Sequence, residues 1–72
     1  MIKKSVLIAG QHSTSISLEE EFFAELKNIA AQKNLSLNQL VTLIDSERTT
    51  ENLSSALRLY VLQFYKNNNG KN

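Results

Sequence analysis

The feature that most constrains the fold is a change of hydrophobic period within residues 12–26, "HSTSISLEEEFFAEL". Polar and apolar residues alternate up to Leu18, which is the pattern of a β-strand with one buried face. Beyond Leu18 the apolar residues recur at helical spacing, at Phe22, Phe23, Leu26, Ile29 and Ala30. We therefore expect a strand over 12–18 that leads directly into a helix, with the buried strand face formed by Thr14, Ile16 and Leu18.

The first helix is predicted over 19–33. Glu19, Glu20 and Glu21 stand in its first turn, where the positive end of the helix dipole stabilises carboxylates. The inward stripe is expected to be Phe22, Leu26, Ile29 and Ala30, widened by Phe23. Asn34 suits the left-handed position that closes a helix.

Two further helices complete the predicted domain. The second is expected over 36–46 with Ser36 as its N-cap, and the third over 52–66, capped by Asn52 or Thr50. The polar segment 47–51 is the predicted loop between them. The tail 67–72, "NNNGKN", has nothing to bury and is expected to be frayed or disordered.

The segment before the alternating strand is open to two interpretations. Residues 2–9 favour β-structure and end at Gly10. Residues 1–10 either form an N-terminal arm or edge strand, or fold back as a hairpin partner. Because "GQ" is a poor signal for a tight hairpin turn, we favour the arm or edge strand. The strand over 12–18 then has no partner within its own chain.

Size and composition indicate a single domain, 1–66, that needs outside stabilisation. The chain has 72 residues, 42% of them hydrophobic, and a core of this size is marginal. It has no cysteine, so disulfides are excluded, and its single histidine and the acids Asp45, Glu47 and Glu51 lack metal-site spacing. We expect no metal and no cofactor. Oligomerisation remains as the source of extra stability.

A second copy of the chain can supply the missing strand partner. An unpaired strand edge is a liability, and an antiparallel pair of the same strand about a two-fold axis removes it. Ser13, Ser15 and Ser17 would then face solvent. The third helix also carries Leu59 and Leu62 away from its main apolar stripe, which suggests a contact with another chain.

The strand "STSISL", the helix "EEEFFAELKNIAAQKN" and the loop with second helix "LSLNQLVTLID" together resemble the ribbon-helix-helix DNA-binding family. The flanking "KSVLIAGQH" and "NLSSALRLYVLQFY" resemble a subgroup of small bacterial members with an extra N-terminal strand and C-terminal helix. The resemblance implies an α+β, mostly helical fold. It also implies an intertwined homodimer with an intermolecular antiparallel β-ribbon.

The family's residue roles, carried over by position, define an expected DNA site. The ribbon lies in the major groove and the start of the second helix binds a phosphate. The implied base contacts are Ser13, Ser15 and Ser17. The implied phosphate contacts are Ser36, Leu37 and Asn38, with Lys3 and Lys4 if the N-terminal arm reaches the backbone. The expected dimer interface is Thr14, Ile16, Leu18, Leu40, Ile44, Leu57, Tyr60 and Phe64.

The sequence departs from the family pattern on the ribbon face. Many relatives carry Arg, Lys, Gln or Asn there, whereas serine discriminates poorly between bases, and serine is also common on any exposed strand face. The predicted binding is therefore weakly specific or shape-dependent. The acidic run 19–21 opposes DNA, and the net charge of +1 decides nothing.

Two functions follow as hypotheses. The first is a cytoplasmic homodimeric DNA-binding protein, a transcriptional repressor or antitoxin-like regulator that binds double-stranded DNA. The second is a dimeric protein-interaction module with a partner on the third helix. Catalysis is not expected, because His12, Ser13 and Asp45 lack a nucleophile elbow and an oxyanion loop. The apolar run from Val6 to Ala9 is too short for a secretory signal or a membrane span.

Overall fold

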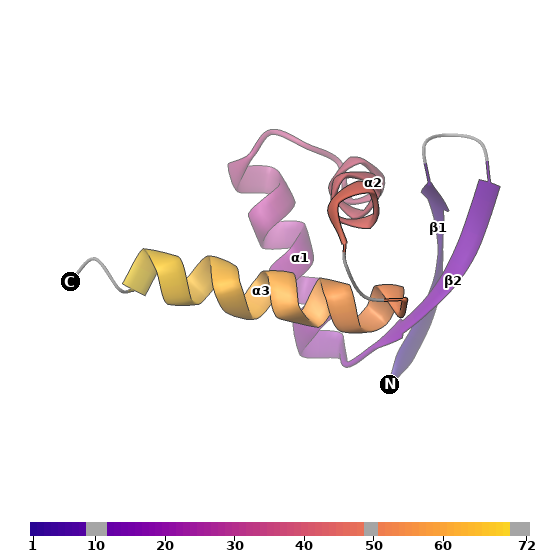
Figure 1. Cartoon of the computed structure of the whole chain (residues 1–72), viewed down its shortest axis with the longest axis horizontal. Helices are drawn as coiled ribbons and strands as arrows, with labels where there is room; N and C mark the ends of the chain where they lie inside the picture. Colours follow the sequence, from indigo (N-terminus) through magenta and orange to yellow (C-terminus); the bar gives the residue numbers. More distant parts are fainter. Residues whose placement is uncertain (9–11, 49–50, 70–72) are drawn as a thin grey trace.

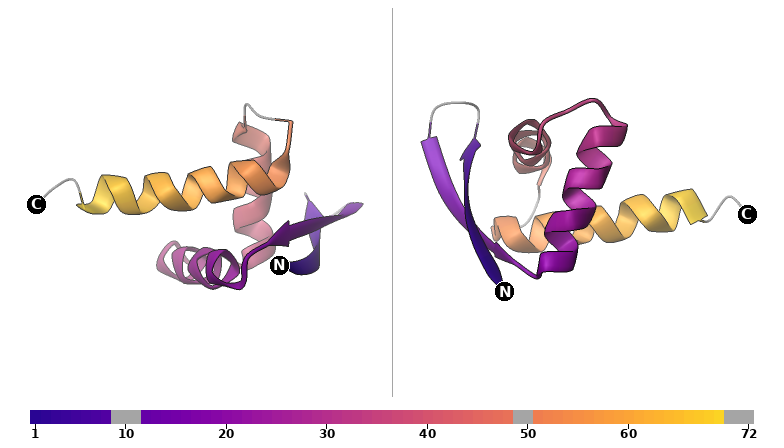
Figure 2. Two further views of the ribbon diagram at one scale, coloured as in Figure 1. Left: turned by 90° about the horizontal axis from the view of Figure 1, so that it is seen from below. Right: turned by 180° about the vertical axis from the view of Figure 1, so that it is seen from behind.

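The computed structural model describes residues 1–8, 12–48 and 51–69. Strand β1 (Ile2–Ile8) pairs with β2 (His12–Leu18), and helices α1 (Glu20–Gln32), α2 (Leu37–Glu47) and α3 (Leu53–Asn69) follow (Figure 1). The helices pack on one face of the hairpin, and the C-terminal half of α3 extends away from it (Figure 2). This confirms the predicted α+β order of strand, two helices and a third C-terminal helix.

The hairpin corrects the preferred interpretation of the N-terminal segment. β1 and β2 are antiparallel over their full length, with Ile2 opposite Leu18 and Ile8 opposite His12. The premise that the strand over 12–18 lacks a partner in its own chain is therefore wrong. The physical reason is that β1 is itself amphipathic and buries Val6 and Ile8 beneath the helices. Gly10 and Gln11, where the hairpin alternative would require a turn, lie outside the described residues.

The two faces of the hairpin differ as the alternation predicts. Ile16 and Leu18 are buried and Thr14 is half-buried, whereas Ser13 and Ser15 are exposed. The inner strand residues join the helices in one contiguous core, which includes Leu26, Ile29, Leu40, Val41, Ile44 and Leu57. A single chain therefore encloses a hydrophobic core without a second copy.

Local signals fix most helix ends. Asn34 has a φ of 60°, the left-handed conformation predicted for it. Ser36 is the N-cap of α2, and the Oδ1 of Asn52 accepts a hydrogen bond from the Ser55 N–H at the start of α3, at 3.1 Å. In α1, Phe23 is buried and Phe22 is only half-buried, so their predicted ranks are reversed.

Helix α3 is longer than predicted. It continues to Asn69, three residues beyond the expected end at 66, so the tail does not begin at 67. No proline or glycine stands within residues 53–69, and the final turn gains from Lys66 near the negative end of the helix dipole. Residues 70–72 lie outside the described part of the chain.

Candidate nucleic-acid interface

The outer face of the hairpin brings the predicted base-contacting serines together. In the strand register, Ser13, Ser15 and Ser17 of β2 stand opposite Leu7, Ser5 and Lys3 of β1. Because directly opposed residues share a face, this surface is polar and carries one cation, Lys3. Leu7, 42% exposed, is its single apolar side chain among the described strand residues.

Lys3 and Lys4, both predicted to contact phosphates, lie on opposite faces of the hairpin. Lys4 lies on the inner face of the hairpin, with its Nζ 5.5 Å from the centroid of the Phe23 ring. The neighbouring Lys27 lowers the pKa of Lys4, through their direct contact and charge repulsion. Lys3 thus belongs to the serine face and Lys4 does not, because alternate residues of a strand point to opposite sides.

The start of α2 has the geometry of an anion site. The capping box occupies two amides: the Ser36 N–H donates to Gln39 Oε1 at 2.8 Å, and the Gln39 N–H donates to Ser36 Oγ at 3.1 Å. The amides of Leu37 and Asn38 find no acceptor among the residues that the structure describes. These amides, at the positive end of the helix dipole, can hydrogen-bond a phosphate.

A side-chain contact places this helix start beside the hairpin. Asn38 Oδ1 accepts a hydrogen bond from the backbone N–H of Leu7, at 3.4 Å. The residues predicted to contact phosphate at the start of α2 therefore lie next to the serine face, along β1. Sequence patterns carry no signal for this contact, because the two residues are 31 positions apart.

The same contact shows in which direction the backbone N–H and C=O groups of the two strands point. The Leu7 N–H points toward α2, so the Leu7–Ser13 pair is a non-hydrogen-bonded pair. Such pairs alternate along an antiparallel ladder, so Ser15 and Ser17 also direct their backbone N–H and C=O groups away from β1. These groups stand at the outer edge of β2.

The outer edge of β2 borders an open hollow. The hollow has a volume of about 560 Å³, and its walls include Ser13, Ser15 and Ser17 on one side and Asp45, Arg48, Asn52 and Ser54 on the other. The outer edge of β1, in contrast, is contacted by α2. Helix α3 also packs against β2, but among the described residues no hydrogen bond is made to the outer edge of β2, so that edge can pair with another chain.

The expected dimer-interface residues fall into two groups. Five of them are at most 4% exposed in the single chain: Ile16, Leu18, Leu40, Ile44 and Leu57. The other three remain half-buried: Thr14, Tyr60 and Phe64. Only the second group retains side-chain surface for a second copy, because the first is already enclosed by its own chain.

Acidic and apolar side chains flank the site. Glu19 forms an ion pair with Arg58 of α3. Glu20 and Glu21, in the first turn of α1, are exposed. Leu59 and Leu62 on α3 are 47% and 58% exposed, as their positions off the main stripe predict.

Among the described residues, no three metal-ligating side chains cluster, and none of the helices is long and apolar enough to cross a membrane.

A strand with an open, polar edge, followed by two helices of which the second begins beside the sheet, defines a small α+β strand-helix-helix domain. The model of the ribbon-helix-helix domain matches residues 1–65, and the chain belongs to this family. Its members typically form homodimers and are DNA-binding transcription regulators or antitoxins. Comparisons with curated proteins and with solved structures gave no significant match.

Proposed function

We propose that this chain is a homodimeric DNA-binding regulator, a repressor or antitoxin-like protein, that places a β-ribbon in the major groove. The observation that carries the proposal is the edge of β2. Its outward backbone groups belong to Ser13, Ser15 and Ser17, the same residues whose side chains lie on the outer face. Pairing that edge with a second copy creates the family's ribbon without disturbing the hairpin.

The register of the proposed ribbon follows from the length of β2. An antiparallel pair centred on Ser15 uses all seven residues of the strand, with Ser13 opposite the partner's Ser17. In this register the outward N–H and C=O groups of the two strands face each other. Because β1 remains paired with β2, the dimer has a four-stranded sheet with β1 at both flanks.

Each strand of that sheet takes a different part in the DNA contact. The two central strands fit a groove about 12 Å wide, and their serines reach the base edges. The flanking β1 strands lie over the groove walls, where Lys3 and the amides of Leu37 and Asn38 meet phosphates. Since serine is short and can either donate or accept, most of the affinity comes from the phosphates.

A salt-dependent titration tests the proposal. Wild-type protein is titrated into duplexes of random sequence at several ionic strengths, and binding is expected to weaken steeply with salt because phosphate contacts release counterions. Ser15→Glu should abolish binding while the protein stays folded. Ala24→Glu adds the same charge at an exposed position of α1 and is the control. Absence of binding by the wild type at low salt contradicts the proposal.

A second candidate function is a dimeric protein-interaction module. The exposed Leu59 and Leu62 on α3 favour it, because such side chains in a row form docking surfaces for helices. This alternative predicts a dimer that fails to retain duplex DNA at low salt. It also predicts that Leu62→Asp abolishes a protein contact and leaves the dimer intact.

A further inference from the structure

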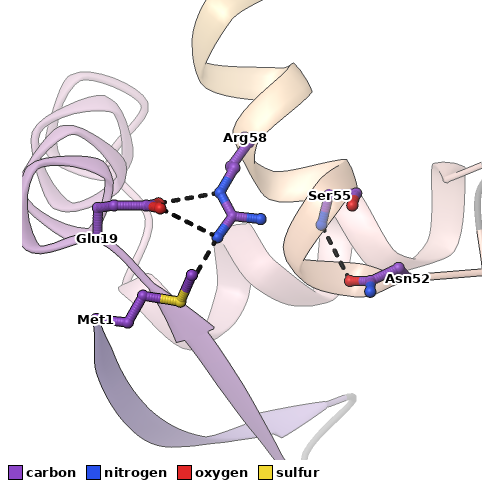
Figure 3. A network of polar contacts seen from close by, with 5 residues as sticks. All are labelled: Met1, Glu19, Asn52, Ser55 and Arg58. Atoms are coloured by element: carbon purple, nitrogen blue, oxygen red, sulfur yellow. Dashed lines mark hydrogen bonds and ion pairs between the residues drawn. The ribbon is translucent and has the colours of Figure 1, made fainter.

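Arg58 of α3 lies where three segments of the chain meet. Its Nε donates to Glu19 Oε1 at 3.0 Å, and its Nη2 lies 3.5 Å from Glu19 Oε2 and 3.9 Å from Met1 Sδ (Figure 3). The contact joins α3 to the residue that links β2 to α1, 39 positions earlier in the sequence. The arginine therefore acts at the end of the strand that carries the serine face.

Glu19 uses its side chain in an unusual way for its position. It is the N-cap of α1, with an extended backbone (φ −62°, ψ 147°), but its carboxylate makes no capping hydrogen bond. Instead the carboxylate turns toward the Arg58 guanidinium, as Figure 3 shows. The hydrogen bond from Arg58 lowers the pKa of Glu19, because it favours the charged form of the carboxylate.

The position of the pair matters more than its contribution to folding. The two side chains are 28% and 43% exposed, and ion pairs in such surroundings add little to stability. Glu19 follows Ser17 by two residues, so an unpaired carboxylate here would stand close to phosphates that approach the outer face. An arginine bound to it removes that repulsion.

We propose that Arg58 is a positioning residue for DNA binding: it neutralises Glu19 and holds the carboxylate toward α3, so that the end of the recognition strand presents no net negative charge. This inference rests on the proposed function. Arg58 acts through Glu19 and does not itself contact DNA. Through this residue, α3 contributes electrostatically to DNA binding, at a position apart from the exposed Leu59 and Leu62.

The test compares duplex affinity of four forms between about 25 and 150 mM salt, a range over which screening changes strongly. Arg58→Gln is expected to bind roughly three- to tenfold more weakly at the lowest salt, and the difference should shrink as salt rises, because it is Coulombic. Arg58→Lys keeps the charge and should stay within about twofold of wild type. Arg58→Gln with Glu19→Gln should return to wild-type affinity.

Two matched variants separate this effect from a change of total charge. Lys66→Gln removes a cation at the far end of α3, and Glu21→Gln removes an acid that does not contact Arg58. The proposal is overturned if Lys66→Gln weakens binding as much as Arg58→Gln. It is equally overturned if Glu21→Gln restores Arg58→Gln as well as Glu19→Gln does, or if the Arg58→Gln defect persists unchanged at high salt.

The remaining outcomes distinguish a failure of the proposed function from a failure of this inference alone. Wild-type protein that binds no DNA overturns both the proposed function and this inference, whereas wild-type binding with an unaffected Arg58→Gln overturns the inference alone. Thermal unfolding checks that each variant folds. If Arg58→Gln does not fold, Arg58→Met, which keeps the apolar stem of the side chain, replaces it in the same comparisons, and an affinity equal to that of the wild type overturns the inference.

Discussion

A proline at position 15 distinguishes the pairing of β2 with β1 from its proposed pairing with β2 of a second copy. The Ser15 N–H points to the outer edge of the strand and makes no hydrogen bond to β1. Proline is tolerated on an edge strand where the missing N–H faces away from the ladder. Ser15→Pro should therefore leave the hairpin and the core of a single chain folded, and should remove the dimer.

The size of the effect follows from the symmetry of the ribbon. In the proposed ribbon, Ser15 and the partner's Ser15 exchange two N–H···O bonds, and the substitution removes both donors at once. Each bond contributes about 0.5–1.5 kcal/mol net, and each carbonyl left unpaired inside the ladder adds about 1 kcal/mol or more. The sum, about 3–5 kcal/mol, weakens the dimer roughly a hundredfold to a few thousandfold.

Sedimentation equilibrium over a concentration series measures this change, with thermal unfolding followed by circular dichroism as the check of folding. Ser15→Ala keeps the N–H and should associate as the wild type does. Ile16→Pro is the opposite control, because the Ile16 N–H belongs to the hairpin ladder and its loss should unfold the chain. A Ser15→Pro protein that dimerises as tightly as the wild type refutes the reasoning.

Three further predictions concern the single chain. Leu57→Ala, at a side chain with 0% exposure, should lower the free energy of unfolding by about 2–5 kcal/mol in urea denaturation. Ser36→Ala removes the cap of α2 and should cost about 1 kcal/mol in the same assay, with a weaker DNA contact if the helix start binds phosphate. The Tyr65 hydroxyl donates to Glu25, which raises the pKa of Tyr65; a raised folded-state pKa means that this contribution to stability is complete below the usual tyrosine value and is lost as the pH rises above it. Tyr65→Phe should therefore flatten the alkaline loss of stability in a series of thermal melts.

The local signals in the sequence were sufficient to place most elements. Alternation located β2 and its two faces, and the helical period together with Asn34 and Ser36 located α1, α2 and the turn between them. These predictions succeeded because each depends on residues within one or two turns of one another. The end of α3 was placed too early, because three consecutive asparagines are weak helix formers that nevertheless continued the helix.

The contacts that organise the candidate site could not be predicted in this way. The pairing of β1 with β2 could not be predicted because the sequence between the two strands has no strong hairpin signal, and the inward position of Lys4 depends on that pairing. The Asn38–Leu7 contact and the Arg58–Glu19 ion pair join residues 31 and 39 positions apart. Such contacts follow from tertiary packing and carry no periodic pattern.

Amide hydrogen exchange along β2 tests the central claim most directly, because neighbouring residues are predicted to behave differently. The amides of Thr14 and Ile16 pair with β1 and should be protected at any protein concentration. The amides of Ser13, Ser15 and Ser17 should become protected only as the protein associates, because only a second copy supplies their acceptors. Three serine amides that exchange at unprotected rates in the fully associated protein would contradict the account.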